Sequence, residues 1–112
     1  MDIQVTVHEN IAKVKLRGRL DTPGVDQISS TFTSSVVHSP KNTVVDLSDV
    51  VFFASMGLRL FISVAKALKR QNARIILFAP QSQVSEVFDT VMLRDLVPIV
   101  ADEAEAVRFA AV

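Results

Sequence analysis

The sequence predicts one α/β domain with a mixed, mostly parallel sheet of about five strands, packed with about four helices in the order ββαβαβαβα. Two segments with alternating polar and apolar residues open the chain, as in half-buried strands. Two near-continuous apolar segments, 43–47 and 74–79, follow and are typical of strands buried on both faces. Segments with helical spacing separate the later strands, and this alternation implies parallel pairing through right-handed crossovers.

Length and composition are those of an ordinary globular protein. The 112 residues suit a single domain, 1–112, with 49% hydrophobic and 21% charged residues. Lys and Arg total 12, as do Asp and Glu, so the chain lacks the basic excess of a nucleic-acid binder. It has no cysteine, no signal-like start and no apolar run long enough to span a bilayer. We expect a cytoplasmic protein without a nucleic-acid partner and without membrane insertion.

The first third of the chain predicts a hairpin followed by a helix. Strands with apolar residues at alternate positions flank a turn at Glu9-Asn10. Segment 17–24 then breaks the alternation and starts a helix that Asp21 or Thr22 caps, with Pro23 in its first turn. The buried stripe of this helix consists of Val25, Ile28, Phe32 and Val36.

The middle of the chain, 44–69, organises the predicted fold. Strand 43–47 leads through a tight polar turn at Ser48-Asp49 into a second apolar run, 50–53. A helix then starts at or next to Ser55 and runs to about Gln71, and Asn72 suits the left-handed position after it. Its predicted buried stripe consists of Leu58, Phe61, Ile62, Ala65 and Leu68.

The last third predicts two short strands and two short helices. Strand 74–79 stops at Pro80, and Ser82 can cap a helix whose inward residues are Val84, Val87, Phe88 and Val91. A short edge strand follows at 96–100. Asp102 caps the last helix, in which Ala106, Val107, Phe109 and Ala110 are expected to close the core.

Ser55, at the strand-to-helix junction, is the candidate functional residue, and its role can be that of nucleophile, cap or phosphosite. A serine nucleophile needs a base, and neither His8 nor His38 is placed near it by the sequence. There is no Gly-rich phosphate loop and no spacing typical of metal ligands, so we expect no enzyme activity, no cofactor and no metal. As a plain N-cap, Ser55 would contribute about 1 kcal/mol over alanine.

Phosphorylation is compatible with the start of a helix, because the helix N-terminus favours negative charge. A phosphate on Ser55 would add about −1.5 to −2 charges to the local surface. Asp21 and Thr22 follow the neighbouring strand and are expected beside Ser55, because loops at the same ends of adjacent strands cluster. A dianion there would repel an acidic partner surface, which makes a workable switch for a protein interface.

The segment 46–58, DLSDVVFFASMGL, resembles the signature of STAS domains, in particular of the bacterial anti-sigma-factor antagonists. Segment 18–21 is similar to their G-(E/R/D)-L-D motif, and 74–80, 84–91 and 93–99 resemble their later motifs. The resemblance covers nearly the whole chain. One departure is Ala54, where the family has an aspartate just before the serine, so an acidic charge beside Ser55 is missing.

The resemblance implies a regulatory protein rather than an enzyme. Members of this class bind an anti-sigma factor that is also a serine protein kinase, and so free a sigma factor. The kinase phosphorylates the serine that corresponds to Ser55, the phosphorylated form no longer binds, and a metal-dependent serine phosphatase restores it. The implied docking surface consists of Asp21, Thr22, Ser55, Met56, Gly57 and Leu58. Arg59 joins it because consecutive helical residues face different ways.

Two other classes stay open from the sequence. One is a STAS scaffold that is not phosphorylated, as a subunit of a stress-signalling complex or of a lipid transporter. The other is an enzyme or small-ligand binder, which the missing histidine and glycine signals disfavour. A basic cluster on and after the central helix is interpreted as a solvated face; it consists of Lys66, Lys69, Arg70 and Arg74.

Overall fold

The computed structural model describes residues 1–37, 41–91 and 97–110, the side chains of 87–91 excepted. The elements follow the predicted order ββαβαβαβα. They are β1 (Asp2–His8), β2 (Ile11–Leu20), α1 (Thr22–Val36), β3 (Asn42–Phe53), α2 (Ser55–Lys69), β4 (Ile75–Phe78), α3 (Ser82–Val91), β5 (Ile99–Val100) and α4 (Glu103–Ala110).

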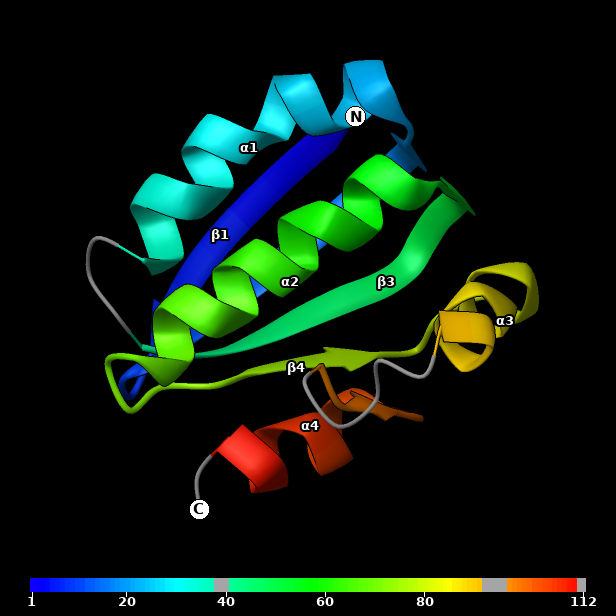
Figure 1. The fold of residues 1–112 in the computed structure, drawn as a ribbon. Coiled ribbons are helices and arrows are strands. Elements are labelled where there is room, and N and C mark those ends of the chain that lie inside the picture. Colours follow the sequence, from blue (N-terminus) through cyan, green and yellow to red (C-terminus); the bar gives the residue numbers. More distant parts are fainter. Residues whose placement is uncertain (38–40, 92–96, 111–112) are drawn as a thin grey trace.

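The strands form one sheet in the order β1-β2-β3-β4-β5 (Figure 1). β1 and β2 are the antiparallel hairpin, whose turn residues Glu9 and Asn10 have φ of 50° and 69°, as a two-residue type I′ turn requires. The pairs β2–β3, β3–β4 and β4–β5 are parallel. The predicted mixed, mostly parallel five-stranded sheet is therefore confirmed, with β3 in its centre.

Helices cover the two faces of the sheet unequally. α1 and α2 lie side by side over one face (Figure 1), where they enclose the main core with the inward residues of β2 and β3. α4 packs against β3 and β4 on the other face, where Ala106 and Ala110 contact a smaller cluster that includes Val44, Ile76 and Phe78. Val107 and Phe109 are 37% and 46% exposed, so the expectation that they close the core is wrong.

Two strands differ from their predicted boundaries. Segment 17–20 does not break the strand, because β2 continues to the buried Leu20 through two register irregularities. Likewise no turn divides β3: Ser48 and Asp49 stay in the strand, and the Asp46 carboxylate accepts hydrogen bonds from the backbone N–H and hydroxyl of Ser48 at 2.9 and 2.7 Å. This side-chain contact lies at the first register irregularity, where the sequence predicted a tight polar turn.

The stripe of α2 is rotated from the prediction. Phe61, Ala65 and Leu68 are buried as expected, but Leu60 and Val64 are buried where Leu58 and Ile62 were expected. The helix is apolar on more than one side near its start, so spacing alone admits both stripes. It ends at Lys69, and Asn72 has φ 59°, which confirms its left-handed conformation.

The caps are confirmed in part. Asp102 caps α4, with its carboxylate accepting from the Glu105 N–H at 2.9 Å. Ser82 does not precede α3 but begins it, and the carbonyl of Gln81 accepts from the N–H groups of Val84 and Ser85. Val84 is buried as predicted. The expectations for Val87, Phe88 and Val91 lie outside the described side chains. The predicted edge strand 96–100 is shorter in the structure, because β5 begins at Ile99 and Val97 and Pro98 precede it.

Three phenylalanines join the helices to β3 in the main core. The Phe61 ring in α2 is stacked on Phe53 at 5.6 Å between centroids and meets Phe32 of α1 edge-on at 5.9 Å. All three side chains are at least 94% buried. Because Phe53 directly precedes the α2 junction, this cluster holds the start of α2 against the sheet.

We predict that Phe61→Ala lowers the free energy of unfolding by about 3–5 kcal/mol, since it removes a fully buried ring and both ring contacts. Urea unfolding followed by circular dichroism measures the change. The matched control is Phe109→Ala, which removes a ring that is 46% exposed and should cost much less. Similar losses for the two variants would contradict this description of the core.

Candidate functional site

The first turns of α1 and α2 lie side by side at the carboxyl edge of the sheet (Figure 1). The last residues of β2 and β3, Leu20 and Phe53, are partners in the register. One residue further on, the Ala54 N–H donates to the Leu20 carbonyl at 3.0 Å. Asp21 and Ala54 are the N-cap residues of the two helices. The expected meeting of the two junctions is therefore present in the fold.

Ser55 is the first residue of α2 and not its cap. Ala54 occupies the N-cap position, where its carbonyl accepts from Gly57 N–H and Leu58 N–H at 3.0 and 3.2 Å, and no side chain caps the helix. The interpretation of Ser55 as a plain N-cap is therefore wrong. Ser55 is exposed at a helix end whose first N–H groups have no acceptor within the helix.

Asp21 is the N-cap of α1 and was one of the two residues, with Thr22, that the sequence predicted for this role. Its carboxylate accepts from the Gly24 N–H at 2.9 Å and from Arg19 Nε at 3.3 Å. The hydrogen bond from Gly24 and the Arg19 guanidinium hold the pKa of the Asp21 carboxyl below its ordinary value. Asp21 therefore stays charged over the whole neutral range, beside the start of α2.

The seven residues of the predicted docking surface differ in exposure. Thr22, Ser55 and Arg59 are exposed, Asp21, Met56 and Leu58 are half-buried, and Gly57 is buried. Arg59 reaches back over the first turn, with Nη1 at 4.0 Å from the Met56 sulfur. A side chain on Gly57 would lie 3.1 Å from the Leu20 Cβ, so this glycine brings α2 close to β2. Gly57 thus supports the surface by packing and offers no side chain of its own.

The sequence interpretation missed a second group of residues near this edge. The Arg19 guanidinium lies 4.2 Å from the centre of the Phe52 ring, and the neighbouring Val51 is 48% exposed. Segment 50–53 was interpreted as one apolar run, whereas Phe53 enters the core and Phe52 is 37% exposed. Alternation along a strand could have found this, because Phe52 and Phe53 must point to opposite faces.

A serine nucleophile with a histidine base and a metal site have little support at this edge. His8 pairs with Ile11 at the start of β2, and Ile11 pairs with Asn42 at the start of β3, so His8 lies at the opposite end of the sheet from Ser55. His38 falls outside the described residues. Within 1–37, 41–91 and 97–110, no group of three His, Cys, Asp or Glu side chains is placed to hold a metal ion.

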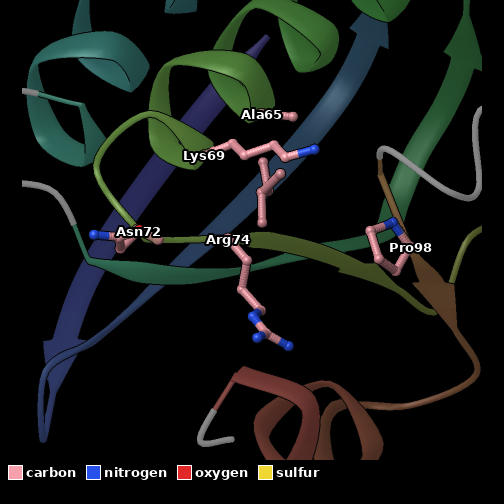
Figure 2. A pocket seen from close by; sticks show the side chains of 7 residues that line it. Ala65, Lys69, Asn72, Arg74 and Pro98 are labelled. Carbon is pink, nitrogen blue, oxygen red and sulfur yellow. The ribbon is translucent and has the colours of Figure 1, made fainter.

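A groove of about 440 Å³ lies at the other end of α2, and its lining includes Ala65, Lys69, Arg74 and Pro98. In Figure 2 the Lys69 side chain lies between α2 and β4, whereas Arg74 extends from β4 toward α4. All four side chains of the predicted basic cluster are exposed. Arg74 Nη1 donates to the Phe109 carbonyl at 3.3 Å, which ties this cation to α4. The groove is separate from the Ser55 junction, because one borders the end of α2 and the other its start.

Residues 2–106 match the STAS domain family. The chain belongs to this family. The anti-sigma-B factor antagonists of Staphylococcus epidermidis and Staphylococcus aureus are 24% identical over 99 residues, which cover 88% of this chain and 92% of theirs. None of the described helices has the length and apolar character needed to cross a membrane.

Solved structures share the fold across the whole STAS domain. An anti-sigma factor antagonist of Mycobacterium paratuberculosis superposes with a TM-score of 0.89 at 20% identity, covering 99% of this chain and 94% of that one. SpoIIAA of Bacillus in its phosphorylated form has a TM-score of 0.72 at 23% identity, covering 96% of this chain and 98% of that one. At these identities the likeness concerns the fold.

We predict that Gly24→Ala destabilises the protein by about 3 kcal/mol, because the added Cβ would lie 2.0 Å from the Arg19 carbonyl oxygen and force the start of α1 away from β2. The matched change is Gly57→Ala, whose nearest contact of 3.1 Å is to a side-chain carbon. The better helix propensity of alanine offsets that strain to within about 1 kcal/mol. Urea midpoints of both variants test this, and equal midpoints would contradict it.

We also predict that Asp21 contributes a pH-dependent part of the stability. Its pKa is lower in the folded than in the unfolded state, so its contribution is present above the ordinary carboxyl pKa of about 3.9 and is lost as the pH falls through the folded-state value. Asp21→Asn keeps a capping side chain that does not titrate. Urea unfolding between neutral and acid pH should show wild type losing stability relative to this variant. A difference that is independent of pH would contradict the assignment.

Proposed function

We propose that this STAS domain is an anti-sigma-factor antagonist, which binds an anti-sigma factor that is also a serine protein kinase. Phosphorylation of Ser55 by that kinase switches binding off, and a serine phosphatase restores it. The observation that carries the proposal is the exposed Ser55 at the first position of α2, with the Asp21 N-cap of α1 on the adjoining strand end. The related anti-sigma-B factor antagonists support the choice of partner.

The partner binds the surface formed by the two helix starts, Asp21, Thr22, Ser55, Met56, Leu58 and Arg59, with Gly57 beneath it. Met56 and Leu58 supply half-buried apolar area at the centre, and Asp21 and Arg59 supply charges of opposite sign. Such a mixture of apolar and charged groups is common in regulated interfaces. The kinase must reach the Ser55 hydroxyl, and its exposure allows that approach.

The physical effect of the phosphate is mainly electrostatic. It adds about −1.5 to −2 charges at pH 7 next to the Asp21 carboxylate. Inside this chain the charge is tolerated, because the N-terminus of α2 offers unpaired N–H groups and has no side-chain cap to displace. Toward an acidic partner surface the same charge is repulsive and costly to desolvate. The phosphate therefore opposes docking without unfolding the domain.

We predict that an anti-sigma kinase of the same organism transfers one phosphate from ATP to wild-type protein and none to Ser55→Ala. Intact-mass measurement detects the transfer, and fragmentation locates it. Ser63→Ala is the matched control, because Ser63 is an exposed serine in the same helix and should leave the transfer unchanged. Phosphate transfer to the Ser55→Ala protein would contradict the switch. A wild-type protein that no such kinase phosphorylates would contradict it as well.

The alternative function is an unswitched scaffold in a stress-signalling complex or a transporter. Ala54 favours this alternative, because no acidic residue directly precedes Ser55. Binding measurements on Ser55 variants distinguish the two functions. Ser55→Asp is expected to bind the kinase at least tenfold more weakly than Ser55→Ala, measured by calorimetry. Equal binding by the two variants would favour the scaffold. The negative charge of the aspartate is smaller than that of a phosphate, so the true switch should have the larger effect.

A further inference from the structure

β1 is an open edge of the sheet. It pairs with β2 along all seven residues in an unbroken register, and its other side has no neighbour among the described strands. Natural edge strands are guarded by bulges, lysines, prolines or shortness. The opposite edge, β5, is only two residues long and follows Pro98, whereas β1 (DIQVTVH) carries none of these protections. The fold therefore leaves one long strand able to pair with another chain.

Backbone groups of alternate β1 residues point away from the domain. In a two-residue hairpin the residues that flank the turn, here His8 and Ile11, form a hydrogen-bonded pair, and such pairs alternate along the ladder. The outward-pointing N–H and C=O groups are therefore those of Ile3, Val5 and Val7. They are spaced two residues apart, as a second antiparallel strand requires.

The same three residues form an incompletely covered apolar row. Ile3 and Val5 pack against the main core and are half-buried, and Val7 is 55% exposed. Their cross-strand partners Ala12, Val14 and Leu16 in β2 are fully buried, so the row is the outer margin of the core. Apolar cover at this margin would come from a chain that continues the sheet.

We propose that a second copy of this chain continues the sheet by pairing its β1 antiparallel with this β1, around a two-fold axis at Val5. This register uses all seven residues. It places Val5 opposite the partner's Val5 and Ile3 opposite the partner's Val7, so that the outward backbone groups form about six hydrogen bonds. The result is a continuous sheet made from the two five-stranded sheets.

Complementary side chains select the second copy as the occupant, because an imidazole N–H can donate a hydrogen bond to a carboxylate. In this register Asp2 faces the partner's His8, and the symmetry repeats the contact at the other end of the strand. These two residues form a non-hydrogen-bonded pair, in which side chains come closest. Gln4 and the partner's Thr6 form the next such pair, so each position finds a polar or apolar counterpart of its own kind. The exposed Val7 gains Ile3 of the partner subunit as an apolar neighbour.

Cross-linking tests the register directly, because the chain has no cysteine of its own. Gln4→Cys and Thr6→Cys proteins, mixed and oxidised gently, should form a disulfide-linked heterodimer, since these positions face each other at about 4.5–5.5 Å between Cβ atoms. Each variant alone should form little, because its cysteines are diagonal at about 7–8 Å. Equal cross-linking in the mixture and in the single variants would overturn the proposed register.

Sedimentation equilibrium tests the dimer itself. Wild type should be a concentration-dependent dimer, and Val7→Lys should dimerise at least tenfold more weakly with its monomer stability kept, because Val7 is mostly exposed. Val107→Lys, an exposed valine on α4, is the matched control and should dimerise like wild type. Val5→Pro should also prevent pairing, since its N–H points outward and an edge strand tolerates proline there.

A charge exchange distinguishes this strand pairing from dimerisation through another face. Asp2→Lys and His8→Glu should each weaken the dimer, and the double variant should restore it by reversing both contacts. Circular dichroism checks that each variant folds. A wild-type protein that stays monomeric up to about 1 mM, or a dimer that is indifferent to Val7→Lys, overturns the proposal. It is independent of the phosphorylation of Ser55, so each can fail alone.

Discussion

The hydrogen bond from the Ala54 N–H to the Leu20 carbonyl, 3.0 Å long, connects the parts of the molecule that the proposed function needs. It extends the parallel pairing of β2 and β3 by one residue beyond the last paired residues. Both chains then turn into helices, so α1 and α2 start from a common backbone contact. Gly24 and Gly57 leave room for that contact. A Cβ on Gly24 would meet the Arg19 carbonyl oxygen, and one on Gly57 would meet the Leu20 side chain.

This arrangement separates the rigid from the responsive parts of the junction. The Phe32, Phe53 and Phe61 rings hold the helices from below, and Asp21 fixes the start of α1 with its carboxylate. The start of α2 has no such side-chain cap. A group added to Ser55 therefore meets open N–H groups and need not break an existing contact. The edge strand β1 is a second, separate surface, whose recognition depends on backbone groups.

The order of elements, the central strand and most buried residues could be predicted, because long apolar patterns determine them. Local features were harder. Ser48 and Asp49 are typical turn residues, yet both lie in β3, where the Asp46 carboxylate accepts hydrogen bonds from Ser48 and Asp49 pairs with Arg17. Alanine is a poor capping residue, so the sequence favoured Ser55 as the N-cap of α2. In the structure Ala54 is the N-cap, because β3 ends at Phe53 and α2 begins at Ser55. The Arg19–Phe52 contact depends on strand register, which one chain segment alone does not encode.

The two register irregularities of β3 have a consequence for the length of this strand. Val45 and Leu47 face the main core, then Val50 and Phe53, so the inward positions are twice spaced by three residues and not by two. Each irregularity exchanges the faces of the strand, and the second reverses the first. At each irregularity β3 has one residue more than β2, so the loss of that residue would restore regular pairing and leave Phe53 facing the core. The segment can therefore shorten at two places without exchanging the faces of Phe52 and Phe53.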